Sequence, residues 1–148
     1  MGEGRRPLPL LVDGHGREHR DLRISLTDHC NLRCIYCMPA EGVPWLPRDE
    51  LLSPAELMRV VRVGLQLGIT EVRLTGGEPL LRPDVVEVVA RIAALSTADG
   101  KRPEVSLTTN GIGLARLAEP LVDAGLSRVN ISLDTLRADR FLKLTRRD

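Results

Sequence analysis

The residues of this chain most suited to chemistry are its three cysteines, Cys30, Cys34 and Cys37, which lie within one short segment. An odd number of cysteines so close together cannot cross-link a secreted fold, whereas in a reducing compartment such a cluster indicates a metal site. The spacing Cys-x-x-x-Cys-x-x-Cys differs from that of electron-transfer ferredoxins, and three thiolates would leave one iron of a four-iron cluster open to a small ligand. The alternative is a zinc site with His29 as the fourth ligand, although a histidine adjacent to Cys30 suits a closed tetrahedral site poorly.

Further polar and glycine residues fall where predicted strands end and helices begin. They are Thr75-Gly76-Gly77-Glu78-Pro79, Thr109-Asn110-Gly111 and Ser132-Leu133-Asp134. Gly76 and Gly77 could let a ligand approach bare backbone, and Glu78 offers a carboxylate for an ammonium group or for structural pairing. A tight turn between a strand and a helix explains the same residues without any ligand.

Composition excludes several classes of protein. The 148 residues have room for about one domain, and a net charge of +1 gives no basic surface for nucleic acid. Aromatic residues make up only 2% of the chain, so the aromatic surfaces on which single-stranded nucleic acid stacks are absent. We expect two of these residues, Tyr36 and Trp45, to shield the cysteine loop as a lid. With no apolar run of about 18 residues and no signal peptide, we expect a cytoplasmic protein without a membrane partner.

The elements that must position these residues follow a repeating order. From Leu22 onward, a short alternating stretch, a turn and a longer helical pattern recur, which is typical of βαβ units and a parallel sheet. The predicted strands are 22–27, 71–75, 104–109 and 128–133. The first predicted helix begins at the capping box that Ser53 and Glu56 form and ends at Gly68, and the others cover about 83–95, 114–124 and a segment from about 136.

The predicted strands alternate between apolar and polar residues, whereas strands covered on both faces are usually apolar throughout. The apolar face expected to pack on helices consists of Leu22, Ile24, Leu26, Val72, Leu74, Val105, Leu107, Val129, Ile131 and Leu133. If right-handed crossovers place every helix on that side, the sheet curls into a barrel or half-barrel with a polar interior. Arg23 and Arg73 would project into it from adjacent strands and favour a carboxylate or phosphate guest. The alternative is a solvent-facing sheet with ordinary surface arginines.

The motif Cys30-x-x-x-Cys34-x-Tyr36-Cys37 followed by Gly76-Gly77-Glu78 resembles the radical S-adenosylmethionine (SAM) enzymes. More narrowly, from about residue 11 to residue 148 the chain is similar to the GTP 3′,8-cyclases of molybdenum cofactor biosynthesis. The matching stretches are Asp21-Leu22-Arg23-Ile24-Ser25, Cys37-Met38-Pro39, Trp45-Leu46-Pro47, Arg73-Leu74-Thr75-Gly76-Gly77-Glu78-Pro79-Leu80, Thr108-Thr109-Asn110-Gly111 and Val129-Asn130-Ile131-Ser132-Leu133-Asp134. The resemblance implies an α/β fold, namely a partial (βα) barrel of the radical SAM type with about four βα units, and a lyase activity.

The resemblance also implies roles for particular residues. Cys30, Cys34 and Cys37 would bind a 4Fe-4S cluster whose open iron holds the amino and carboxylate groups of SAM. Reduction would cleave SAM to methionine and a 5′-deoxyadenosyl radical, and GTP would be cyclised to (8S)-3′,8-cyclo-7,8-dihydroguanosine 5′-triphosphate. By the family pattern, the SAM contacts are Tyr36, Gly77 and Ser132, and the GTP contacts are Arg23, Arg73 and Thr108. An electron donor of the flavodoxin or ferredoxin type is implied as a partner, and a homodimer stays open.

Enzymes of this kind continue for a further stretch that carries more strands and three later cysteines for a second cluster. This sequence has no cysteine after Cys37. We therefore expect an N-terminal arm over residues 1–20 and a truncated radical SAM core over residues 21–148. Three hypotheses follow: the amino-terminal part of a GTP cyclase, a non-catalytic iron-sulfur and SAM-binding fragment, or a radical SAM enzyme with another substrate.

Overall fold

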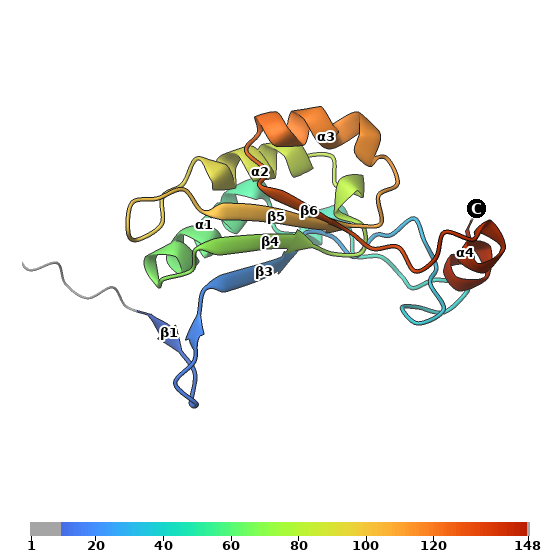
Figure 1. Cartoon of the computed structure of the whole chain (residues 1–148), viewed down its shortest axis with the longest axis horizontal. Helices are drawn as coiled ribbons and strands as arrows, with labels where there is room; N and C mark the ends of the chain where they lie inside the picture. The colour runs from blue at the N-terminus through green and yellow to red at the C-terminus, as the bar shows by residue number, and fades with distance from the viewer. Residues whose placement is uncertain (1–9, 148) are drawn as a thin grey trace, which may run out of the picture.

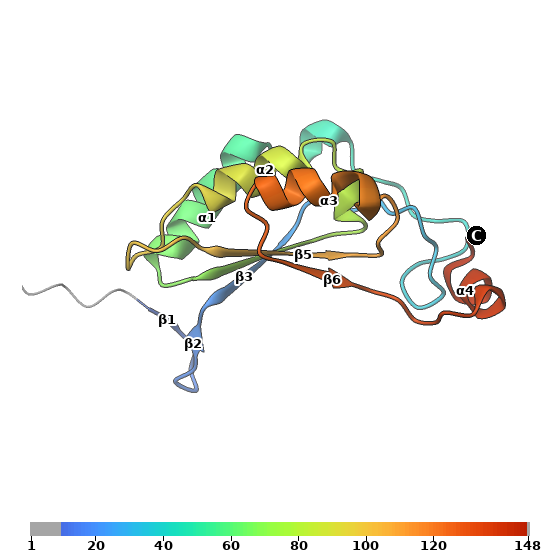
Figure 2. The same ribbon diagram turned by 45° about the horizontal axis from the view of Figure 1, so that its top comes forward.

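The computed structural model describes residues 10–147 and contains a four-stranded parallel sheet with helices on one face (Figures 1 and 2). The strands are β3 (Asp21–Ser25), β4 (Glu71–Thr75), β5 (Glu104–Thr109) and β6 (Arg128–Ile131), and their spatial order follows the chain. The predicted α/β fold with parallel strands is confirmed. The first strand ends two residues earlier than predicted, where β4 also ends: the Leu26 N–H donates to the carbonyl of Thr75, the last residue of β4, and the Thr27 carbonyl accepts from the Gly77 N–H of the loop that follows. The fourth also ends two residues early, and the last bond to β5 runs from the Ser132 N–H to the Thr109 carbonyl, at 2.8 Å.

The helices lie close to the predicted positions. They are α1 (Pro54–Gln66), α2 (Val85–Ala93), α3 (Leu114–Asp123) and α4 (Ala138–Thr145), with short 3-10 helices η1 (Arg48–Glu50) and η2 (Pro79–Leu81). The predicted capping box is present, since Ser53 accepts a hydrogen bond from the Glu56 N–H and Glu56 accepts one from the Ser53 N–H. None of the helices within residues 10–147 is long and apolar enough to cross a membrane.

The core lies between the sheet and helices α1, α2 and α3. Fully buried strand residues contribute one side of it and fully buried helix residues the other: Val72, Leu74, Val105 and Leu107 face Val61, Leu65, Val88, Val89, Ile92 and Leu121. The prediction for the fourth strand is wrong in part, because Ile131 and Leu133 are 57% and 52% exposed. They lie toward the carboxyl end of β6, an edge strand in the described part of the chain, where no helix covers them.

Two segments extend from this layered unit. At its amino end, β1 (Leu11–Val12) pairs antiparallel with β2 (Glu18–His19) and forms a small hairpin before β3. Residues 1–9 of the predicted arm lie outside the described residues, and the boundary at residue 20 stays a prediction. At the other end, α4 lies beyond the carboxyl ends of the strands and beside the loop that follows β3, as both views show (Figures 1 and 2). Segments far apart in sequence therefore meet where the cysteines are.

Candidate functional site

The cysteine loop, residues 26–47, connects β3 to η1 and carries all three thiols. Cys30 and Cys34 are half-buried, Cys37 is exposed, and none forms a disulfide. The backbone turns tightly between them, because the N–H groups of Cys37 and Met38 both donate to the Cys34 carbonyl, at 2.9 and 3.2 Å. Burial is the main cause that raises the pKa of the Cys30 and Cys37 thiols, and the charge of Cys34 adds to both shifts. The three sulfurs therefore lie within one another's electrostatic field.

The donor set of this loop fits a multinuclear cluster better than a single ion. Among residues 10–147, no three His, Cys, Asp or Glu side chains converge closely enough to hold one metal ion. His29, the fourth ligand of the zinc alternative, packs its ring against Trp45 with the ring centroids 5.2 Å apart. An iron-sulfur cluster is bound by cysteine thiolates through several irons, so its ligands stand farther apart than those of tetrahedral zinc. Thiolates are the ligands that such a cluster takes, so the three cysteines of the loop fit it by residue type.

The two glycines after β4 make the close contact between this loop and the cysteine loop possible. The Gly77 N–H donates to the Thr27 carbonyl and the Glu78 N–H to the His29 carbonyl, both at 2.7 Å. A Cβ on Gly76 would lie 2.4 Å from the Thr27 carbonyl oxygen, and one on Gly77 would lie 2.3 Å from that of His29. Neither position can therefore hold a side chain, because the backbone of the cysteine loop lies too close.

Glu78 ties three loops together at the carboxyl ends of the strands. Its side chain is 1% exposed and accepts hydrogen bonds from the Thr109 hydroxyl at 2.7 Å, the Asn110 N–H at 2.8 Å and the Leu80 N–H at 3.0 Å. The Asn110 side chain then donates to Asn31 of the cysteine loop at 2.8 Å. Of the two roles expected for Glu78, the structure places it in structural pairing.

Trp45 packs against two side chains of the cysteine loop, Arg33 and His29. The Arg33 guanidinium lies 5.1 Å from the centroid of the Trp45 ring, and the His29 ring also contacts Trp45. Arg33 also donates to the Cys30 and Leu32 carbonyls, at 2.7 and 2.9 Å. The expected packing of Trp45 onto the loop is present. Arg33 was not singled out from the sequence, and its position between two cysteines was the signal available.

The segment that follows β6 also contacts the cysteine loop. The Arg33 and Ile35 N–H groups donate to the Thr145 and Leu144 carbonyls of the α4 end, at 2.8 and 2.9 Å. The Tyr36 hydroxyl donates to Asp134 at 2.5 Å, and this hydrogen bond is the main cause that raises the Tyr36 pKa. Tyr36 itself remains 63% exposed. Residues 134–147 therefore hold the cysteine loop through these hydrogen bonds, an arrangement that no sequence motif indicated.

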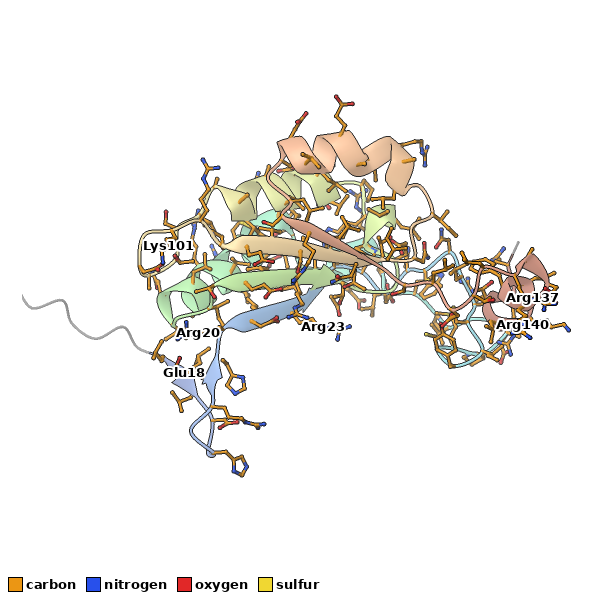
Figure 3. All side chains as sticks on the ribbon, viewed as in Figure 1. Glu18, Arg20, Arg23, Lys101, Arg137 and Arg140 are labelled. Atoms are coloured by element: carbon orange, nitrogen blue, oxygen red, sulfur yellow. The ribbon has the colours of Figure 1, made fainter. Side chains whose placement is uncertain are left out.

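The polar face of the sheet carries the two predicted arginines side by side. Arg23 of β3 and Arg73 of β4 are register partners, and Figure 3 shows Arg23 projecting from β3 on the side away from α2 and α3. Arg73 is already paired, because its Nε lies 2.5 Å from an Asp21 oxygen and 3.1 Å from a Glu71 oxygen. Thr108 lies on β5, and Ser132 lies just beyond the end of β6. Arg73 is therefore held in ion pairs, whereas Arg23 is exposed and forms no ion pair with a described residue.

A cavity of about 480 Å³ opens beside the cysteine loop, with Thr27 and His29 of that loop in its lining. Its lining includes His29, Arg48, Leu52, Arg82 and Asp84. None of the cysteines lines it, and neither arginine of the polar face does. We therefore place the candidate site at the cysteine loop and the polar face, where the three thiols and the two aligned arginines are, and not in this cavity.

The fold and this set of residues define the chain as a member of the radical SAM superfamily, whose family model matches residues 24–148. Relatives similar to it include the GTP 3′,8-cyclases of Mycolicibacterium smegmatis, Corynebacterium glutamicum and Streptomyces coelicolor, which are 60%, 55% and 59% identical. These matches cover 93–94% of this chain and 37–40% of each relative, so the chain spans about two fifths of their length.

The solved structure of Streptococcus suis SuiB bound to S-adenosylmethionine is similar in fold, with a TM-score of 0.58. It covers 84% of this chain and 27% of the SuiB chain at 22% identity, which supports the fold alone. Membership of the superfamily implies a 4Fe-4S cluster and SAM as cofactors. The three thiols, the two close loops and the donor geometry described above fit that pair.

Proposed function

We propose that this chain is the cluster-binding and SAM-binding portion of a GTP 3′,8-cyclase, the lyase that acts in molybdenum cofactor biosynthesis. The observation that carries the proposal is the 55–60% identity to GTP 3′,8-cyclases across nearly the whole chain, together with three free thiols in one loop. Of the three hypotheses from the sequence, this one also accounts for the arginines on the polar face, which a chain that only stored a cluster would not need.

In this proposal Cys30, Cys34 and Cys37 hold the cluster and leave one iron for SAM. When bound, the cluster supplies the electron that cleaves SAM to methionine and a 5′-deoxyadenosyl radical. The protein positions the reactants: the tight turn at Cys34 sets the thiols, and the Gly77 backbone brings the SAM-binding loop against the cysteine loop. Tyr36 and Ser132 are the other SAM contacts. The hydrogen bond from Tyr36 to Asp134 fixes the tyrosine beside the thiols.

GTP binds on the polar face, where Arg23, Arg73 and Thr108 are its contacts. Guanidinium groups pair with phosphate oxygens through two parallel hydrogen bonds, so two arginines on neighbouring strands suit a polyphosphate. The Thr108 hydroxyl lies nearer the carboxyl ends of the strands, toward the cysteine loop. In this proposal the phosphates lie at the arginines and the nucleoside lies closer to the cluster.

The remaining assignments belong to the same proposal. The electron comes from a small donor protein of the flavodoxin or ferredoxin type, and the exposed Cys37 and Tyr36 mark the nearest accessible surface. The reaction takes place in the cytoplasm, where free thiols persist. A homodimer is compatible with the exposed edge of β6.

The test uses the chain reconstituted anaerobically with iron and sulfide, then mixed with SAM, GTP and a strong reductant. We expect 5′-deoxyadenosine by mass spectrometry, its loss in Cys34→Ala, and GTP binding that weakens in Arg73→Ala but not in Arg91→Ala, an exposed arginine of α2 paired with Glu87. Cysteine-dependent 5′-deoxyadenosine without GTP binding would favour another substrate. A folded, iron-loaded chain that forms no 5′-deoxyadenosine would support the non-catalytic fragment.

A further inference from the structure

The polar face of the sheet is ordered in rows that cross the strands. Register pairing aligns Asp21 with Glu71 and Glu71 with Glu104, which makes an acidic row at the amino ends of three strands. Two residues along, Arg23, Arg73, Ser106 and Arg128 are aligned in the same way across four strands and make a basic row. Side chains two residues apart share one face, so the acidic row stands directly behind the basic row, about 7 Å away.

Glu71 is the residue that joins the two rows. One of its oxygens lies 3.1 Å from Arg73 Nε, and the same oxygen accepts a short hydrogen bond from Arg128. It also accepts a hydrogen bond from the Ser106 hydroxyl at 3.3 Å. The Glu71 side chain is only 21% exposed, whereas Arg73 and Arg128 are about twice as exposed. A half-buried carboxylate thus holds two long side chains at the surface.

The arginines of the row differ in what holds them. Arg73 forms ion pairs with Asp21 and Glu71, whose oxygens both lie near its Nε, but none of its side-chain nitrogens makes a hydrogen bond within residues 10–147. Arg23 forms no ion pair with any described residue, and its Nε lies 3.5 Å from the Thr75 hydroxyl. The Nη1/Nη2 edge of Arg73 can donate two parallel hydrogen bonds to an oxyanion without disturbing these contacts.

We propose that Glu71 is a positioning residue that presents the Arg73 guanidinium to the polyphosphate of the substrate, with Asp21 as its second support. This inference rests on the proposed function, since it deepens the GTP site named there. Glu71 touches no substrate in this scheme and acts through Arg73. The aligned Arg128, held by the same carboxylate, keeps Glu71 in place from the other side.

The sign of the expected effect separates positioning from plain electrostatics. Removing a negative charge about 7 Å from an anion should strengthen anion binding about threefold in water, and less in salt. Releasing a long arginine side chain from its partner has a larger, opposite effect. The freed side chain must lose its rotamer freedom when the anion binds, which weakens anion binding about tenfold or more. Asp21 retains part of the restraint, so positioning predicts a net weakening of about fivefold.

The experiment measures binding by titration calorimetry at about 150 mM salt, near physiological ionic strength. GTP, inorganic tripolyphosphate and guanosine are titrated into the full chain, reconstituted anaerobically, as wild type and as Glu71→Gln, Arg73→Ala and the double variant. Glu104→Gln is the matched control, since Glu104 lies in the same acidic row and contacts Arg128 at 3.6 Å with no ion pair to Arg73. Unfolding midpoints check that every variant is folded.

We expect Glu71→Gln to bind GTP and tripolyphosphate about fivefold more weakly, to bind guanosine as the wild type does, and to cause no further loss when Arg73 is already alanine. Glu104→Gln should bind like the wild type. Unchanged or tighter tripolyphosphate binding by Glu71→Gln, or an equal loss in the Arg73→Ala background, would overturn the positioning role. If the wild type binds neither GTP nor tripolyphosphate, the proposed function fails and this inference fails with it.

Discussion

Replacing Glu78 with glutamine tests how the three loops at the carboxyl ends of the strands are held together. The wild-type carboxylate receives three donors: the Thr109 hydroxyl and the Leu80 N–H on one oxygen, and the Asn110 N–H on the other. Glutamine offers one acceptor oxygen and one NH2 group. Whichever way the amide is placed, an NH2 group faces a backbone N–H and leaves that donor without a partner.

The size of the effect follows from this count. A buried backbone donor without a partner costs about 1–3 kcal/mol, and the bonds that remain lose the strengthening that the negative charge provides, so we expect Glu78→Gln to lower the free energy of unfolding by about 2–4 kcal/mol. Glu119→Gln is the control, because Glu119 is exposed on α3 and its replacement should change stability by less than about 0.5 kcal/mol.

The assay is urea unfolding of the folded chain, from which the midpoint and slope give the free energy of unfolding. Iron bound per chain after anaerobic reconstitution is the second measurement, because Asn110 links this network to Asn31 between the first two cysteines. We expect Glu78→Gln to bind less iron than the control. A stability change as small as that of Glu119→Gln would refute the reasoning, since it would mean that the three donors find other acceptors.

Two further predictions concern the loops beside the cysteines. Gly77→Ala places a Cβ 2.3 Å from a backbone carbonyl oxygen, so we expect it to destabilise the chain by about 1–3 kcal/mol and to reduce iron binding, whereas Gly14→Ala, where nothing lies within 4 Å, should leave unfolding and iron content unchanged. A hydrogen bond from Arg82 holds the Asp84 pKa below its ordinary value. The stability that this provides is fully present above that ordinary value and is lost as the pH falls through the lowered pKa, so wild type and Asp84→Asn should differ most at neutral pH and converge in acid during urea unfolding. A stability gap that stays constant with pH would contradict this assignment.

The local patterns of the sequence predicted most of the fold correctly. Alternation and capping residues located four strands and four helices to within a few residues, because these signals act between neighbours in the chain. The fate of Ile131 and Leu133 was not predictable in this way. Their alternation matches that of Val105 and Leu107, yet burial depends on whether a helix covers the end of that strand, which is a property of the whole layer.

The same distinction between local sequence and tertiary structure applies to the candidate site. The sequence by itself determined which groups are available: three thiols at a characteristic spacing, two glycines, and arginines at polar positions of neighbouring strands. Only the tertiary structure decided what each group contacts. It placed Glu78 among three donors and bound Arg73 to Asp21 and Glu71, because these partners come from strands and loops that only folding brings together. Residue type and spacing indicate which chemistry is possible. Hydrogen bonds and ion pairs, in contrast, depend on distances of a few ångströms between segments that are remote in the chain.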